Sequence, residues 1–207
     1  MNLVALYQPF HQLLNKTTIA EGIAPLLIRI YLAPVLIQAG WNKYSSFENT
    51  VSWFANPDWG LGLPMPGLLA SLAIAAELLG GVMLLIGLAT RWVSIPLMIT
   101  MLVAAFAVHW DNGWLAIADA NSWLADGTLL YNESIANAPA KLEAAKSILG
   151  EHGNYGWLTE SGSFVILNNG IEFAMTYFIM LFSLFFTGAG RYTSLDYFIA
   201  RTCLPKQ

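Results

Sequence analysis

Glu77 is the residue of this chain whose surroundings most clearly point to chemistry. It lies near the middle of GLLASLAIAAELLGGVMLLIGLA, residues 67–89, in which every other residue is apolar or small. A run of this length can cross a bilayer. Because an ionisable side chain at the centre of a membrane span costs roughly 3 kcal/mol or more, Glu77 is expected to face a partner or a cavity.

Arg29 places the opposite charge inside a second apolar stretch, APLLIRIYLAPVLIQAG. Counting about 1.5 Å per residue from the ends of both helices puts Arg29 and Glu77 at depths within reach of a long arginine side chain. Whether the two side chains face each other depends on helix rotation, which the sequence alone does not fix. A carboxylate in a low-dielectric site suits proton relay, which the reduction of a quinone needs at its carbonyl oxygens. Arg29 and Glu77 are therefore the candidate catalytic pair, and the alternative is an ion pair that only fixes helix register.

A second polar cluster is predicted at the outer membrane surface. Lys43 follows the first apolar stretch, His109 ends the third, and Glu172 begins the fourth, with Asp111 just beyond His109. Histidine titrates near neutral pH, so His109 could shuttle protons or bind a metal. We assign Lys43, His109 and Glu172 to a cofactor-binding site and assign no metal site, because one histidine is a weak metal signal. The alternative is a set of ordinary interfacial side chains.

The elements that must position these residues are four membrane-spanning helices. Each is on the order of the 17–25 residues that a span needs. Small residues four apart on the second span, from Ser71 to Gly81, predict close helix packing rather than a ligand site. The predicted spans are residues 23–40, 67–88, 92–110 and 171–188.

Two further helical segments are predicted outside the spans. Residues 1–18 have apolar side chains at helical spacing and predict an amphipathic helix, which either lies in the membrane interface or caps the bundle. Residues 111–168 are too long for a structureless connection and predict a helical cap. Within the cap, a helix is expected to start near Asn137 and to end at Gly150 or Gly153.

The composition supports an all-α integral membrane protein with a single domain in contact with the lipid bilayer. Hydrophobic residues make up 57% of the 207 residues and charged residues 11%, whereas a soluble domain has about 25% charged residues. The single cysteine excludes a CxxC redox pair, and without a basic stripe nucleic-acid binding has no electrostatic support. No motif for a tightly bound haem or nucleotide is present, and the hypothetical cofactor is the quinone to which Glu77 would deliver protons.

The distribution of basic residues predicts the orientation in the membrane. Arg91 and Arg191 lie in or beside short connections on one side of the predicted bundle. By the positive-inside rule, both termini are then cytoplasmic and the acidic cap is periplasmic, with the bundle in the inner membrane. Protein partners are expected in the membrane or the periplasm, and the oligomeric state is left open.

The segments LLIRIYLAPVLIQAGWNKY and AAELLGGVMLLIGLATRW resemble the first two helices of the DoxX family of membrane proteins. This resemblance implies a four-helix membrane bundle and a relation to thiosulfate:quinone oxidoreductase subunits. Arg29, Lys43 and Glu77 fall on its motif positions. The later segment HGNYGWLTESGSFVILNNGIEFA resembles a narrower branch, associated with the biosynthesis of copper-binding modified peptides.

Three functions are consistent with these observations. The first is a quinone-linked redox accessory subunit of the inner membrane, which in the narrower branch would serve a copper-responsive peptide-maturation system. The second is a non-enzymatic membrane scaffold that anchors partner proteins through the cap. The third is a small exporter of metal or peptide, which would require several copies because four helices enclose only a narrow lumen.

Overall fold

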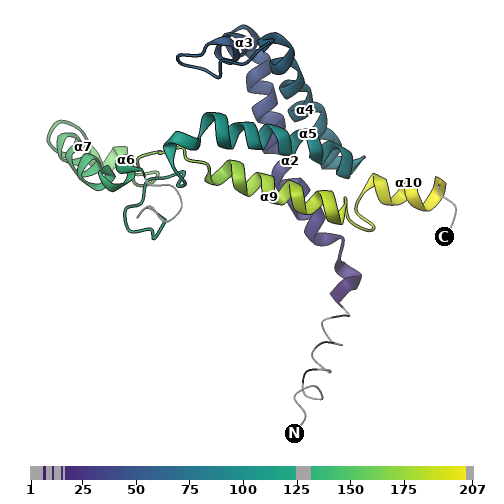
Figure 1. Ribbon diagram of the computed structural model, residues 1–207. Coiled ribbons are helices and arrows are strands. Elements are labelled where there is room, and N and C mark those ends of the chain that lie inside the picture. The colour runs from purple at the N-terminus through teal and green to yellow at the C-terminus, as the bar shows by residue number, and fades with distance from the viewer. Residues whose placement is uncertain (1–6, 8–10, 12–14, 16, 125–131, 204–207) are drawn as a thin grey trace. The chain divides into compact units, whose positions relative to one another are not determined.

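The computed structural model of the protein describes residues 7, 11, 15, 17–124 and 132–203 (Figure 1). Over these residues the secondary structure is helical, apart from one isolated antiparallel bridge between Ile117 and Leu167. The predicted all-α class is therefore confirmed. The amphipathic helix predicted over residues 1–18 falls mostly outside the described residues.

Three helices are long and apolar enough to cross a membrane. They are α2 (Ile23–Ser45), α4 (Pro66–Ile86), and α5 (Thr90–Val103) with its π-helical continuation η2 (Ala104–Val108). Helix α9 (Glu172–Thr187) is apolar but has 16 residues, or roughly 24 Å, against a hydrocarbon core of about 30 Å. The membrane fold class is confirmed, while the fourth span stays a prediction.

Two helix boundaries differ from expectation near the candidate site. Helix α2 does not end at Gly40 but runs on to Ser45. A further helix, α3 (Phe47–Ala55), then precedes the loop rich in Trp, Pro and Gly. The sequence WNKYS carries polar residues but no helix breaker, so hydropathy marked the end of the apolar run rather than the end of the helix.

The chain divides into two compact units, one of residues 1–100 with 179–207 and the other of residues 101–178. The first unit contains α2, α3, α4, most of α5, the end of α9 and α10 (Leu195–Cys203). Its fully buried apolar side chains include Leu32, Leu36, Leu84, Leu97, Leu181 and Leu184.

Helices α2 and α4 pack closely and antiparallel in the first unit, because glycines lie between them. A Cβ on Gly40 would lie 2.9 Å from the Cβ of Glu77, and a Cβ on Gly81 would lie 2.7 Å from Cγ1 of Ile37. Such small residues let helix backbones approach. The packing role predicted for the small residues of α4 is thus confirmed at Gly81.

The second unit holds the predicted helical cap. Its helices are α6 (Glu133–Ala136), α7 (Ala138–His152) and α8 (Tyr155–Leu158). Helix α7 begins after Asn137, as predicted, and ends before Gly153 rather than at Gly150. Two extended segments, residues 113–118 and 166–172, pair through backbone hydrogen bonds such as Ala118 N to Ile166 O at 2.9 Å.

Replacing Gly81 with leucine should force α2 and α4 apart and destabilise the protein by about 1–3 kcal/mol, the range for overpacking a close contact. Gly67→Leu is the matched control on the same helix, because nothing lies within 4 Å of a Cβ at Gly67. The measurement is thermal unfolding in mild detergent followed by circular dichroism. Equal melting temperatures for the two variants would contradict the close α2–α4 contact.

Candidate functional site

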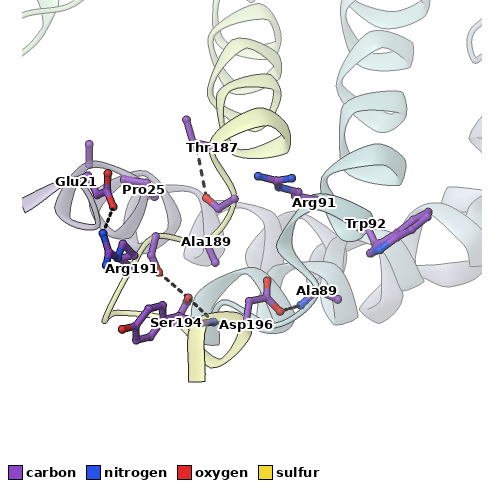
Figure 2. Close-up of a pocket in the computed structure, with 14 residues that line it drawn as sticks. Glu21, Pro25, Ala89, Arg91, Trp92, Thr187, Ala189, Arg191, Ser194 and Asp196 are labelled. Atoms are coloured by element: carbon purple, nitrogen blue, oxygen red, sulfur yellow. Dashed lines mark hydrogen bonds and ion pairs between the residues drawn. The ribbon is translucent and has the colours of Figure 1, made fainter. Parts of the chain in front are cut away.

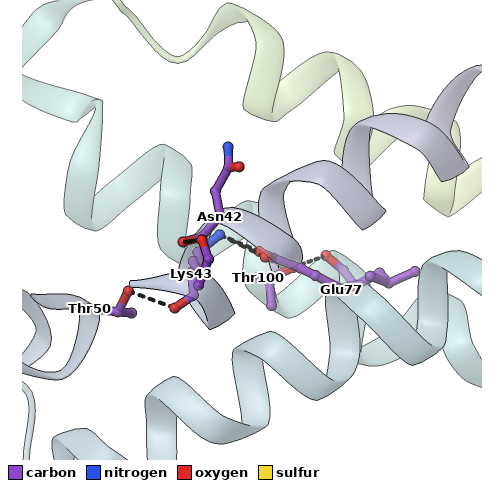
Figure 3. A network of polar contacts seen from close by, with 7 residues as sticks. Asn42, Lys43, Thr50, Glu77 and Thr100 are labelled. Atoms are coloured by element: carbon purple, nitrogen blue, oxygen red, sulfur yellow. Dashed lines mark hydrogen bonds and ion pairs between the residues drawn. The ribbon is translucent and has the colours of Figure 1, made fainter. Parts of the chain in front are cut away.

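A buried ion pair between Lys43 and Glu77 joins α2 to α4 (Figure 3). The Lys43 ammonium donates to both carboxylate oxygens of Glu77, with Nζ 2.9 Å from Oε1 and 2.7 Å from Oε2. The Glu77 side chain is 4% exposed and that of Lys43 30% exposed. The carboxylate is therefore sealed in the helix contact, while the lysine connects it to the surface.

The sequence around each partner explains how the two side chains meet. On α4, Glu77 belongs to a buried stripe at helical spacing, which comprises Ala70, Ile74, Glu77, Gly80, Gly81 and Leu84. On α2, Lys43 follows Gly40 by about one turn and so shares its face. Thr50 of α3 donates to the carbonyl oxygen of Lys43 at 3.1 Å, which ties the start of α3 to the end of α2 (Figure 3).

Arg29 does not pair with Glu77, contrary to our expectation. Its Nη2 donates to the carbonyl oxygen of Thr193 at 2.8 Å, and a Cβ on Gly87 would overlap its Nη1. Because α2 and α4 are antiparallel, Arg29 lies at the Ile86 end of α4. It precedes Gly40, which faces Glu77, by about three turns, or roughly 16 Å along the axis.

The physical reason for this correction is the register of the two helices. The depth estimate counted Glu77 from the outer end of its helix and Arg29 from the inner end of the first span, which does not fix how the two helices are aligned. In the structure Gly40 lies opposite Glu77, and α2 continues to Ser45. This offset brings Lys43, which was assigned to a separate outer cluster, to the position predicted for Arg29.

Arg29 anchors a second polar cluster, which sequence reasoning missed. The side chain is fully buried, and among the described protein atoms its Nε and Nη1 have no hydrogen-bond partner. The Asp196 carboxylate, whose charge attracts Arg29, accepts from the backbone amides of Ala89 at 2.6 Å and Thr90 at 2.9 Å. These amides begin α5, so Asp196 caps that helix. A carboxylate just after the last apolar run, in GAGRYTSLDYF, was the available signal.

His109 and Glu172 contact backbone groups of the second unit. His109 Nδ1 lies 2.9 Å from the carbonyl oxygen of Asn169, and Glu172 Oε2 accepts from the amide of Ala116 at 2.9 Å. Lys43 belongs to the first unit, in the ion pair with Glu77. Within the described ranges, no three His, Cys, Asp or Glu side chains are grouped as a metal site would require.

An apolar groove adjoins the ion pair. It has a volume of about 440 Å³ and lies between the end of α2, the start of α3 and one side of α4. Tyr44 and Leu78, the residues that follow Lys43 and Glu77, both line it. The other lining residues are Phe47, Ser71, Ile74, Ala75 and Leu79. Lys43 and Glu77 are not themselves among the lining residues.

Comparisons with known proteins place the ion pair inside a recognised domain. The model of the DoxX family matches residues 24–110, which include both Lys43 and Glu77. The putative oxidoreductase CatD of Bacillus subtilis (strain 168) is 30% identical over 86 residues, which cover 42% of this chain and 60% of that protein. No solved structure matches. The resemblance seen in the first two helices is confirmed, and the narrower copper-peptide branch stays a prediction.

Replacing Lys43 with methionine should cost about 3 kcal/mol of unfolding free energy, because it leaves the buried Glu77 carboxylate without its partner. The double variant Lys43→Met with Glu77→Leu should recover most of this loss, since an apolar pair replaces a buried ion pair at little cost. Lys141→Met, at an exposed lysine of α7, is the control for loss of one charge. Denaturant unfolding in detergent measures all three, and equal losses in the single and double variants would contradict the pairing.

Proposed function

The chain belongs to the DoxX family through residues 24–110, and on that premise we propose that it is a quinone-linked redox accessory protein of the membrane. The observation that carries the proposal is the buried Lys43–Glu77 pair between two candidate spans. Paired intramembrane charges mark proton and ion pathways by default. The name of the Bacillus relative, a putative oxidoreductase, agrees with redox chemistry.

In this proposal the ion pair delivers protons. A quinone accepts two electrons, here from a partner protein with a flavin or metal centre, and two protons to become a quinol. Lys43 is the more exposed partner and takes up protons from outside the helix contact. Glu77 touches its ammonium at 2.7 Å, so a proton can pass from Nζ to the carboxylate and onward as a general acid.

The groove beside the pair fits the apolar part of such a substrate. Its lining is almost entirely apolar, with Tyr44 and Phe47 as the aromatic members. Ligand sites of this kind combine an apolar lining with few polar groups that fix orientation. Arg29 lies about three turns along α2 from Gly40, the residue that faces Glu77, and is not part of this site. His109 and Glu172 are proposed to hold residues 113–118 and 166–172 in place through their contacts with Asn169 and Ala116.

The proposed setting is the inner membrane with cytoplasmic termini. Arg91 and Arg191 are assigned to the cytoplasmic side by the positive-inside rule, which places Lys43 toward the periplasmic half. The likeness of residues 152–174 to the copper-peptide branch supports a role in a copper-responsive maturation system, where the protein would exchange electrons with a periplasmic or membrane partner.

Purified wild-type protein should retain about one quinone per chain, and Glu77→Gln should retain much less, because the amide cannot hold the Lys43 ammonium as a carboxylate does. Glu160→Gln, at an exposed carboxylate of the cap, should match the wild type. Chromatography of a solvent extract measures the bound quinone. Quinone reduction by membranes containing Glu77→Gln should also fall by about 100-fold, the lower range for loss of a general acid.

A wild-type protein without quinone, or a Glu77→Gln protein with unchanged quinone content and unchanged pH dependence of reduction, would contradict this proposal. A loss caused by misfolding is recognised from the melting temperature, which the isosteric glutamine should lower far less than Lys43→Met does.

A scaffold is the second candidate function, and the exposed apolar side chains of the cap favour it. Ile148 on α7 is 61% exposed and Trp157 on α8 is 69% exposed. Replacing both with serine should abolish cross-links between the cap and a partner in native membranes, while Glu77→Gln should keep them. Cross-linking with mass spectrometry measures this, and cross-links that survive the serine variant would count against a scaffold role for this surface.

A further inference from the structure

A pocket of about 750 Å³ opens in the first unit where three apolar helices have their ends (Figure 2). Pro25 near the start of α2, Trp92 near the start of α5 and Thr187 at the end of α9 all line it. Because α2 and α5 are candidate membrane spans, their ends are expected at the depth of the lipid headgroups. The pocket is thus placed to meet lipid phosphates rather than acyl chains.

Two arginines line this pocket, and their charges are balanced differently. Arg191 forms an ion pair with Glu21, with Nη1 3.2 Å from Oε1. Arg91 donates from Nη2 to the carbonyl oxygen of Phe186 at 3.0 Å. Over the described part of the chain, no carboxylate forms an ion pair with Arg91.

The pocket's two carboxylates are already engaged. Glu21 binds Arg191, and Asp196 accepts from the first amides of α5 and attracts the buried Arg29. Arg91 is therefore left without an ion-pair partner among the described residues, and most of its five N–H donors stay available. A guanidinium with free donors binds a phosphate through two parallel hydrogen bonds.

Two contacts place the exposed Arg91 side chain, its hydrogen bond to Phe186 and its approach to Gly188. Its guanidinium lies against Gly188, where an added Cβ would be 3.4 Å from Nε. Gly188 has a φ of 77°, a conformation that favours glycine. Figure 2 shows the side chain extending from α5 toward the segment with Thr187 and Ala189. Its neighbour Trp92 is 76% exposed, and tryptophan is the side chain enriched at headgroup depth.

We propose that this pocket binds the phosphate of an anionic phospholipid, with Arg91 as its main ligand and Trp92 beside the glycerol region. The helix ends place the pocket at headgroup depth, and Arg91, which lacks an ion-pair partner, attracts the phosphate. The exposed indole of Trp92 favours a lipid over a free phosphate ion. The proposal concerns a different site from the Lys43–Glu77 pair and does not depend on quinone chemistry.

The test uses the full chain in mild detergent, titrated with short-chain phosphatidylglycerol and followed by native mass spectrometry. Arg91→Gln should weaken binding about fivefold, which corresponds to about 1 kcal/mol for one basic residue at an anionic membrane surface. Arg201→Gln, at an exposed arginine of α10 outside the pocket, should leave binding unchanged. Glu77→Gln should also leave it unchanged, which separates this site from the proposed function.

Four outcomes would overturn the proposal. Equal weakening by Arg91→Gln and Arg201→Gln would mean diffuse attraction to the surface, and equal binding of phosphatidylcholine would mean apolar adsorption. Competition by inorganic phosphate at the same concentration as the lipid would mean an anion site without lipid preference. Arg91→Lys keeps the charge but loses the two parallel hydrogen bonds, so weaker lipid binding by folded Arg91→Lys than by the wild type supports the proposal even if Arg91→Gln fails to fold, and unchanged binding would mean attraction by charge alone.

Discussion

The register of α2 against α4 determines where each buried charge of the first unit can lie. Gly40 packs directly against Glu77, Gly81 against Ile37, and Gly87 against the Arg29 guanidinium, because none of these glycines has a side chain in the way. A Cβ at any of these glycines would meet the opposing helix or its side chains at distances that require movement. Sliding one helix by a turn would therefore break three close contacts at once, together with the Lys43–Glu77 pair. A single set of backbone contacts thus fixes both polar clusters.

Stability alone does not account for the ion pair. Removing charged groups from water costs several kcal/mol per ion, and well-packed apolar residues of similar volume are often as stable or more stable. Glu77 bears this cost more fully than Lys43, because its side chain is 4% exposed and that of Lys43 30%. The unequal burial lowers the cost for Lys43, whose ammonium keeps contact with the surface while Glu77 lies sealed in the helix contact. The proposed proton delivery requires the same arrangement, with one group exposed and the next enclosed.

The sequence was sufficient for the kind of the elements and for the position of most of them, but it missed α3 and did not fix the helix register. Hydropathy located α2, α4 and α5, and capping residues located α7. Glu77 was recognisable because its run offers no other charge. Its partner was not recognisable, because the alignment of Gly40 with Glu77 decides that Lys43 rather than Arg29 reaches Glu77, and no local pattern gives that alignment. The hydrogen bond from Arg29 to Thr193 and the attraction between Arg29 and Asp196 likewise join distant parts of the chain.

The two ends of the α2–α4 pair consequently have different physical characters. At the Arg29 end, the C-terminal segment closes the structure: Thr193 accepts from Arg29, and Asp196 binds the amides of the α4–α5 connection. Disturbing this end would loosen the start of α5 as well as α2. At the Lys43 end, α3 covers the helices through Thr50, and an apolar groove lined by Tyr44 and Leu78 remains open. A ligand in this groove would not break the contacts that hold the helices in register, whereas a ligand in the pocket at the Arg29 end would lie against Ser194 and Asp196 of the C-terminal segment.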